Sequence, residues 1–248
     1  MTKNIFRDFV ILPCSLIAVF LLLSLKQTIF HPVIAAEPNA TTVEESKSKY
    51  IGEKIVYDVS LGWINLGQAT FQHLPNITID GKPVVVMTFE TKVKGFYDLE
   101  KIYSDPVTAL PLRVVRHING WGYNEKIIED YNQKDSILKL NKFSGKKKEE
   151  KQVKVNGIIY NAVLLPFFIR QIKEFSFGWS ILAHIPQEFK INFVGIEEVR
   201  VPAGKFLAYL FKSEPDNFVI WISADERRIP LKIKSQGSTM AMKEYGLQ

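Results

Sequence analysis

The sequence predicts an all-β domain in which one curved antiparallel sheet is accompanied by one or two helices. Two observations support this prediction. From residue 52 onward, short apolar or alternating runs recur with glycine, proline, asparagine and aspartate between them, which is the pattern of antiparallel strands joined by turns. The 248 residues are 46% hydrophobic and 12% aromatic, so the chain has enough apolar material for a sizeable folded core.

The N-terminal residues are predicted to form a leader. Lys3 and Arg7 precede an uncharged run over residues 9–25, and two small residues follow at Ala35–Ala36. A basic start, an apolar stretch and a small-residue cleavage site are typical of a secretory signal peptide. We therefore expect a signal peptide over residues 1–36. The alternative is an uncleaved N-terminal anchor, which would contact the membrane.

The exported part of the chain is expected to begin with a polar linker over residues 37–50, followed by one domain over 51–248. The predicted location is the periplasm, or the inner membrane with the domain facing the periplasm. The only cysteine, Cys14, lies in the leader, so the domain can form no disulfide. Its stability is expected to come from apolar burial and strand pairing.

Each expected strand is a run with period-two or continuous apolar character that ends at a turn residue. The expected strands cover residues 53–61, 66–74, 84–93, 97–103, 112–118, 123–131, 137–143, 152–155, 189–194, 199–201, 206–212, 218–223, 231–235 and 240–245. So many strands cannot form one flat sheet, because both faces and both edges would need cover. We expect the sheet to curl into an open or closed barrel.

One segment breaks the period-two pattern and is the expected helix. Over residues 161–173, the apolar side chains fall on one helical side. Pro166 would remove a hydrogen bond and clash with the preceding turn inside a helix. The helix is therefore expected to begin at Pro166 or to bend there.

The sequence contains no residue constellation that specifies a reaction. His73, His117 and His184 are widely separated, and with one cysteine in the leader no metal site or other cofactor is expected. The three lysines at 146–148 are followed by two glutamates and have no interleaved aromatic residues, so no nucleic acid partner is expected. The basic excess is mild, with a formal net charge of +6. It favours an anionic surface such as lipid headgroups without requiring one.

Four separated motifs resemble the exported bacterial family of unknown function DUF3108. They are GEKIVYDV at 52–59 with Gly62 and GQA at 67–69, LPLR at 110–113, VPAGKF at 201–206, and WISADERRIP at 221–230. The resemblance extends over about residues 50 to 247 and implies an exported β-rich domain, similar in plan to the open barrels of periplasmic lipoprotein carriers. It implies no catalytic residues. One departure is Asn161, where the family tends to place an aspartate before its helix, although asparagine can still cap.

The expected function is noncatalytic binding or carriage of an apolar or lipidic ligand, such as a lipid or a lipidated chain, in the cell envelope. The sheet carries more large aromatic side chains than one covering helix needs, and such residues line apolar ligand sites. The candidate lining residues are Trp63, Phe89, Trp121, Phe167, Phe168, Trp179 and Trp221. The alternatives are an envelope scaffold that binds other proteins and, less favoured, a hydrolase with an unrecognised site.

Overall fold

The structure is a computed structural model that describes residues 50–120 and 122–247. The expected leader, residues 1–36, and all but the last residue of the expected linker lie outside this part of the chain. The described residues form fourteen strands and one short helix. Their bounds are β1 Glu53–Leu61, β2 Ile64–Ile79, β3 Lys82–Val93, β4 Phe96–Ser104, β5 Pro111–Gly120, β6 Tyr123–Asn132, β7 Ile137–Ser144, β8 Lys147–Lys154, α1 Leu165–Ile169, β9 Ser180–Ile185, β10 Gln187–Val201, β11 Gly204–Glu214, β12 Phe218–Ser223, β13 Pro230–Ser235 and β14 Ser238–Leu247.

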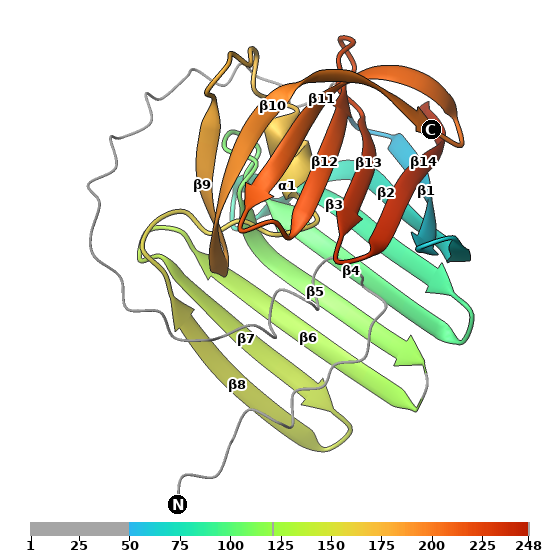
Figure 1. Cartoon of the computed structure of the whole chain (residues 1–248). Helices are drawn as coiled ribbons and strands as arrows, with labels where there is room; N and C mark the ends of the chain where they lie inside the picture. The colour runs from blue at the N-terminus through green and yellow to red at the C-terminus, as the bar shows by residue number, and fades with distance from the viewer. Residues whose placement is uncertain (1–49, 121, 248) are drawn as a thin grey trace, which may run out of the picture.

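All fourteen strands belong to one antiparallel sheet with the order β8-β7-β6-β5-β4-β3-β2-β1-β14-β13-β12-β11-β10-β9. The first eight strands therefore form one meander and the last six form another. The two meanders meet where β1 pairs with β14. The connection from β8 to β9 contains α1 and returns across the concave side of the curved sheet (Figure 1).

The sheet curls without closing, because its two edge strands, β8 and β9, do not pair with each other. The segment after β8 covers part of the free edge of β9 through a bridge between Ile159 and His184. The side chain of Gln133, in the β6–β7 turn, accepts a hydrogen bond from the Ile159 N–H (3.0 Å) and donates one to its carbonyl (2.8 Å). The prediction of a curved, barrel-like, nearly all-β sheet is thus confirmed in its open form.

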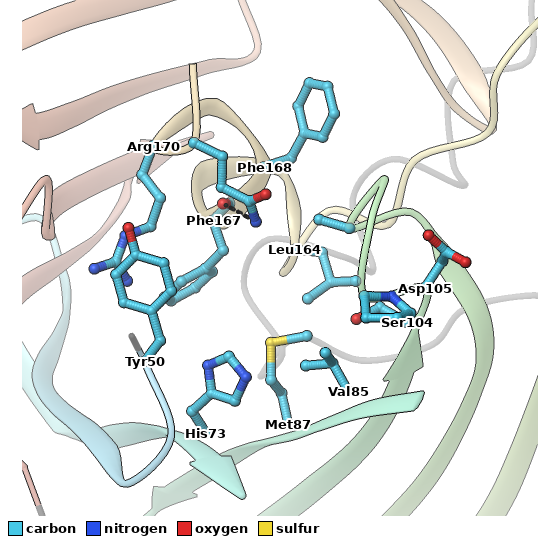
Figure 2. Close-up of a pocket in the computed structure, with 13 residues that line it drawn as sticks. Tyr50, His73, Val85, Met87, Ser104, Asp105, Leu164, Phe167, Phe168 and Arg170 are labelled. Carbon is cyan, nitrogen blue, oxygen red and sulfur yellow. Dashed lines mark hydrogen bonds between the residues drawn. The ribbon is translucent and has the colours of Figure 1, made fainter. Parts of the chain in front are cut away.

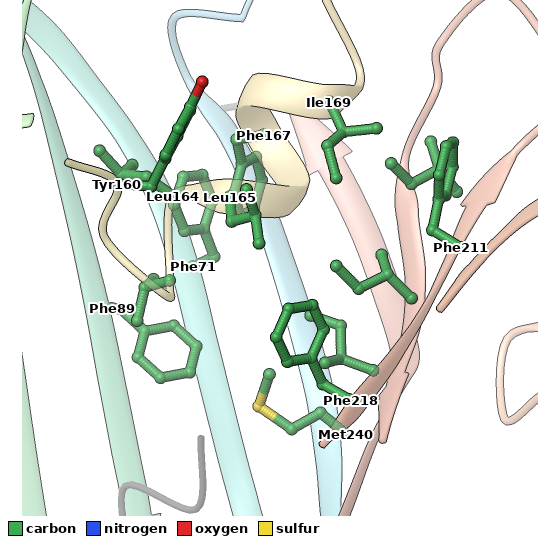
Figure 3. Close-up of a cluster of buried hydrophobic side chains, with 14 of the residues drawn as sticks. Phe71, Phe89, Tyr160, Leu164, Leu165, Phe167, Ile169, Phe211, Phe218 and Met240 are labelled. Carbon is green, nitrogen blue, oxygen red and sulfur yellow. The ribbon is translucent and has the colours of Figure 1, made fainter. Parts of the chain in front are cut away.

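The core lies on the concave side of the sheet, where the inward-facing side chains of the strands pack against α1. In β1, Ile55, Tyr57 and Val59 are almost fully buried, while the residues between them are partly exposed. From the opposite side, α1 contributes Leu165 and Phe167 to the same cluster of buried apolar side chains (Figure 3). The sheet therefore needs only this short helix and its flanking segments to cover the centre of its concave face.

The helix is shorter than the segment expected to form it. It covers five residues, with Pro166 in its first turn, as expected from the fixed φ of proline. After Ile169 the backbone tightens, since the Gln171 N–H donates to the Phe168 carbonyl. The turn before the helix is capped by Asn161, whose Oδ1 accepts hydrogen bonds from the N–H groups of Val163 (2.9 Å) and Leu164 (3.1 Å).

Two features of the second meander differ from the expected strand pattern. Strand β9 is absent from the expected set. The expected strands 189–194 and 199–201 form one strand, β10, with a register shift between Phe193 and Gly195. The long β10–β11 hairpin arches toward β14 (Figure 1), where the Ala203 N–H donates to the Met242 carbonyl (3.0 Å).

Candidate functional site

Helix α1 is the element around which the candidate site is built. The ring of Phe167 stacks on that of Phe71 from β2, with ring centroids 3.6 Å apart and planes inclined by 15°. Phe89 of β3 is the cross-strand neighbour of Phe71 and is buried beside it (Figure 3). Phe168 points elsewhere and packs edge-on against Tyr160 at 5.0 Å. Aromatic side chains therefore fill the concave face beneath the helix.

A buried ion pair holds the C-terminal end of α1. The Arg170 guanidinium donates to both carboxylate oxygens of Glu53 in β1, at 2.6 and 2.9 Å, and to the Arg227 carbonyl at 2.8 Å. Arg170 is 3% exposed and Glu53 is 0% exposed. The guanidinium also lies 3.9 Å from the ring centroid of Tyr50. This bidentate geometry fixes the end of the helix to the first strand.

A chain of polar side chains holds the segment before α1. Asn161 donates through Nδ2 to the Tyr131 hydroxyl (3.3 Å), and Tyr131 in turn donates to Glu129, its neighbour in β6. Burial raises the pKa of the Glu129 carboxyl, against the lowering effects of its bond to Tyr131 and of Arg116. Both ends of the helical segment are thus joined to strands by buried polar contacts.

A group of buried charges lies next to this chain, on the inner side of β4 and β5. Arg116 Nε donates to Asp98 at 2.9 Å and lies 3.5 Å from Glu100 Oε1. The three side chains are between 2% and 6% exposed. Burial raises the pKa of the Glu100 carboxyl well above its usual range, Arg116 opposes the rise, and Asp98 and Glu129 add to it. One guanidinium therefore faces three carboxyl groups.

A small pocket opens between α1 and strands β2 to β4 (Figure 2). It has room for about 40 Å³, which is space for two or three water molecules. Its walls are partly apolar, with Val85, Met87 and Phe168, and partly polar. The polar wall consists of Tyr50, His73, Ser104, Asp105, Arg170 and Gln171. An acyl chain does not fit in this volume.

The polar wall contains donors that are not fully satisfied. Within the described part of the chain, Arg170 Nε and Ser104 Oγ are buried and make no hydrogen bond. Burial, and then the charge of Arg170, lower the pKa of His73 to about 4, so this histidine is neutral at pH 7. Because Ser104 Oγ has no hydrogen-bonded base, it lacks the activation that a serine nucleophile requires. Among the described residues, no cluster of histidine, cysteine and carboxylate side chains could hold a metal ion.

The structure does not bring the seven predicted ligand-lining residues together. Phe167 and Phe168 belong to α1, and Phe89 of β3 lies beneath it (Figure 3). Trp179 belongs to a second aromatic group, 5.1 Å from Phe175 and 5.8 Å from Phe211 between ring centroids. Trp63 is on the β1–β2 turn and 93% exposed. Trp121 lies outside the described residues.

Trp221 lies on the convex face of the sheet. Because side chains alternate along a strand, it points away from the neighbouring Ile220, which pairs with the inward-facing Phe211. Its indole N–H donates to Glu197 of β10 at 2.7 Å, and the Lys232 ammonium lies 5.4 Å from its ring centroid. Trp221 is nevertheless only 8% exposed. Its contacts therefore join β12 to the β10–β11 hairpin rather than line the concave side.

Sequence reasoning missed the buried charges. Glu53 and Arg170 are 117 positions apart, so no local pattern relates them. In β4 the inward face carries Asp98 and Glu100, while the partly exposed face carries Tyr97 and Leu99. The alternation alone favours the opposite orientation, since acidic residues are seldom buried. The sequence did contain one signal that could have pointed to buried charges, because both faces of β4 mix apolar and polar residues.

The comparisons with known proteins name no activity. A β-barrel-like protein of unknown function (DUF1849) from Brucella abortus has a similar fold, with a TM-score of 0.51 and 9% identity over 80% of this chain and 98% of its own. A protein with a YmcC-like fold from Bacteroides fragilis matches 79% of this chain and 96% of its own, with 9% identity and a TM-score of 0.30. No curated protein matches the chain.

Within residues 50–120 and 122–247, no helix has the length and apolar character needed to cross a bilayer. The sequence itself matches a family model, described as a protein of unknown function (DUF3108), over residues 56–241. This match covers most of the strands and all of α1, so the resemblance carried by the four motifs is confirmed. The chain belongs to the DUF3108 family.

Proposed function

We propose that this protein is a noncatalytic domain of the cell envelope that binds an amphiphilic ligand, a lipid or a lipidated chain, on the concave face beneath α1. The proposal rests on how α1, the short segment that covers the concave face, contacts the sheet. A five-residue helix places Phe167 against the aromatic side chains of β2 and β3, on a sheet whose edges do not close. An acyl chain offers these strands the same apolar contact that the helix does.

Binding then requires α1 to move aside. The pocket of about 40 Å³ is too small for an acyl chain, so the ligand replaces the ring of Phe167 rather than fills existing space. The pocket's polar wall, with His73 and Ser104, lies beside the apolar surface that this movement uncovers (Figure 2). Such a surface suits a ligand that has both an apolar tail and a polar head. Such ligands occur in the cell envelope. The N-terminal sequence, which is first basic and then apolar, supports export of the domain to that compartment.

The proposal is tested by titrating the full chain with a fatty acid that carries a fluorescent nitrobenzoxadiazole group and by displacing it with lysophosphatidylglycerol. We expect saturable binding of one probe per chain. Phe167→Ala should bind more tightly, because a tail can occupy the space that the ring leaves. Phe177→Ala is the matched control, since Phe177 is 97% exposed and lies outside the site.

Both variants retain the N-terminal residues, so binding of the probe to the apolar leader is the same in each. Equal affinities of the two variants would place the probe away from α1 and contradict the proposal. The absence of saturable binding in both variants would also contradict it. Mass spectrometry of lipids that co-purify with the chain from native membranes then identifies the natural ligand class.

A scaffold role is the second candidate, and one observation favours it. A shallow polar hollow of about 700 Å³ lies on the outer side of β14, β1, β2 and β3. Lys54, Asp58 and Lys243 are among its lining residues. If an envelope protein binds there, Lys54→Glu with Lys243→Glu should abolish its capture and leave probe binding unchanged. Capture that survives this double change would rule out the hollow as the interface.

A further inference from the structure

The turns of the first meander form a row at one end of the sheet. Because consecutive strands are antiparallel neighbours, every second turn lies at the same end. The turns after β1, β3, β5 and β7 therefore follow one another along one margin, from near β14 to the free edge at β8 (Figure 1). Neighbouring strands are about 4.8 Å apart, so successive turns of this tip row are about 10 Å apart.

The first turn of the tip row is apolar and exposed. Trp63 is 93% exposed, and the flanking Leu61 and Ile64 are each 47% exposed. The turn is held in place, since the Gly62 N–H donates to the Gly237 carbonyl of the β13–β14 turn at 3.2 Å. A fixed tryptophan that the fold leaves in water, beside two exposed aliphatic side chains, is typical of a contact surface.

The second and fourth turns of the same row are basic. Lys94 lies in the turn after β3, and Lys146 and Lys147 lie at the turn after β7. All three are exposed, and none forms a salt bridge with a carboxylate of the described residues. The fourth turn is about 30 Å from the first, at six strand spacings. Free positive charge thus extends along the margin that begins with the exposed apolar turn.

We propose that the tip row docks on the surface of an anionic lipid bilayer. Trp63 lies at the level of the headgroups, where amphipathic aromatic rings partition, and Leu61 and Ile64 contact the outer part of the acyl chains. Lys94, Lys146 and Lys147 lie over the lipid phosphates, which attract such lysines within a Debye length. Charge complementarity selects a bilayer with anionic headgroups over a zwitterionic one. The inference is independent of ligand binding beneath α1.

Quenching of tryptophan fluorescence by brominated acyl chains tests the docking in the full chain, whether or not the leader also holds the membrane. Vesicles contain brominated phosphatidylcholine alone or with 30% phosphatidylglycerol. Every chain in this experiment carries Trp121→Phe, because Trp121 lies in the sequence between β5 and β6. We expect quenching in the anionic vesicles that Trp63→Phe removes. A chain with Trp63→Phe and Phe177→Trp moves an exposed indole to the opposite strand ends, before β9, and should not be quenched there.

The basic turns are tested by charge reversal. Lys94→Glu, Lys146→Glu and Lys147→Glu together should weaken the apparent affinity for anionic vesicles by about a hundredfold or more. Lys82→Glu is the matched control, because Lys82 is exposed at the opposite end of the same meander. The proposal is overturned if Trp63 is not quenched, if quenching is equal without phosphatidylglycerol, or if Lys82→Glu has the same effect as the triple change. Probe binding by the Trp63→Phe chain reports separately on the site beneath α1.

Discussion

Glu53 and Arg170 form an ion pair in which both side chains are removed from water. Such a pair contributes little net stability by itself, because desolvation offsets the attraction between the charges. Losing one member has a much larger effect, since the other charge is left buried and unpaired. The pair therefore specifies where α1 meets β1 more than it strengthens the fold.

Arg170→Met is expected to lower the free energy of unfolding by about 3–5 kcal/mol, because Glu53 then lacks its guanidinium. The double variant with Glu53→Leu should recover most of this loss, since no buried charge remains. Urea denaturation followed by circular dichroism measures both. Glu53→Leu alone is measured in the same way. If the losses of Arg170→Met and of Glu53→Leu simply add in the double variant, the two side chains are not energetically coupled.

His73 predicts an acid-dependent loss of stability. Its pKa is lowered from 6.5 to about 4 in the folded chain by burial and by Arg170. The unfolded chain therefore takes up this proton first as the pH falls, and stability decreases between pH 6.5 and pH 4 by at most about 3 kcal/mol. His73→Gln should remove this part of the pH dependence, as measured by urea denaturation at several pH values. His117→Gln, at an exposed position, serves as the control.

At the scale of elements, glycines fix where β2 bends. Val59 pairs with Gly67 and Ser60 with Asn65, so β2 contains a bulge beside the turn that presents Trp63. Gly67 has φ +148°, and its N–H donates to Asn65 Oδ1 at 2.9 Å. The bulge increases the local twist and directs the end of the hairpin.

Gly67→Ala is expected to cost about 3 kcal/mol or more, because a Cβ would overlap the Lys92 carbonyl and come within 2.9 Å of Val93 Cα. Gly62→Ala is the control. It also has positive φ, +58°, but nothing lies within 4 Å of its Cβ position, so about 1 kcal/mol is expected. Thermal unfolding of the two variants compares them. Equal melting temperatures would mean that the backbone near Lys92 yields without cost.

Strand existence was predictable from the sequence where one face is consistently apolar, as in β1 and β12. It was not predictable where a segment distant in the sequence lies against the strand and determines which of its residues are buried. In β9, Ala183, His184 and Ile185 are buried in succession because Ile159 lies along the strand edge, so no alternation appears. In β10 the register shift at Gly195 interrupts the pattern. The site was less predictable still, since the aromatic residues could be identified but their faces and partners depend on the curl of the sheet.

At the scale of the whole molecule, an open sheet must protect its free edges from other chains. Part of the β9 edge is covered by Ile159 and Tyr160, whose N–H donates to the His184 carbonyl at 2.8 Å. Strand β8 has no such cover among the described elements. It is instead densely charged, with the sequence KKEEKQVK and nearly every side chain exposed, which is a common way to prevent edge-to-edge pairing.

Replacing Lys148, Glu150 and Gln152 of β8 by valine should therefore cause self-association through this edge. Sedimentation velocity is expected to show species larger than those of the wild-type chain at the same concentration. Lys101→Val is the control, because Lys101 is exposed on β4, which has a neighbour on each side. Identical sedimentation of all three chains would show that the charges of β8 are not needed to keep the edge free.

The pairing of β1 with β14 has a consequence for the order in which the sheet is completed. Residues 53–61 pair on one side with β2, in a local hairpin, and on the other side with residues 238–247 of β14, which a ribosome adds after every other strand of the sheet. A growing chain can form its early hairpins, but the two meanders cannot pair with each other until β14 has been synthesised. Loss of residues 238–247 would therefore delete no peripheral strand, because β14 lies between β1 and β13. It would split the sheet down the middle, and neither remaining piece would have the other against which to fold.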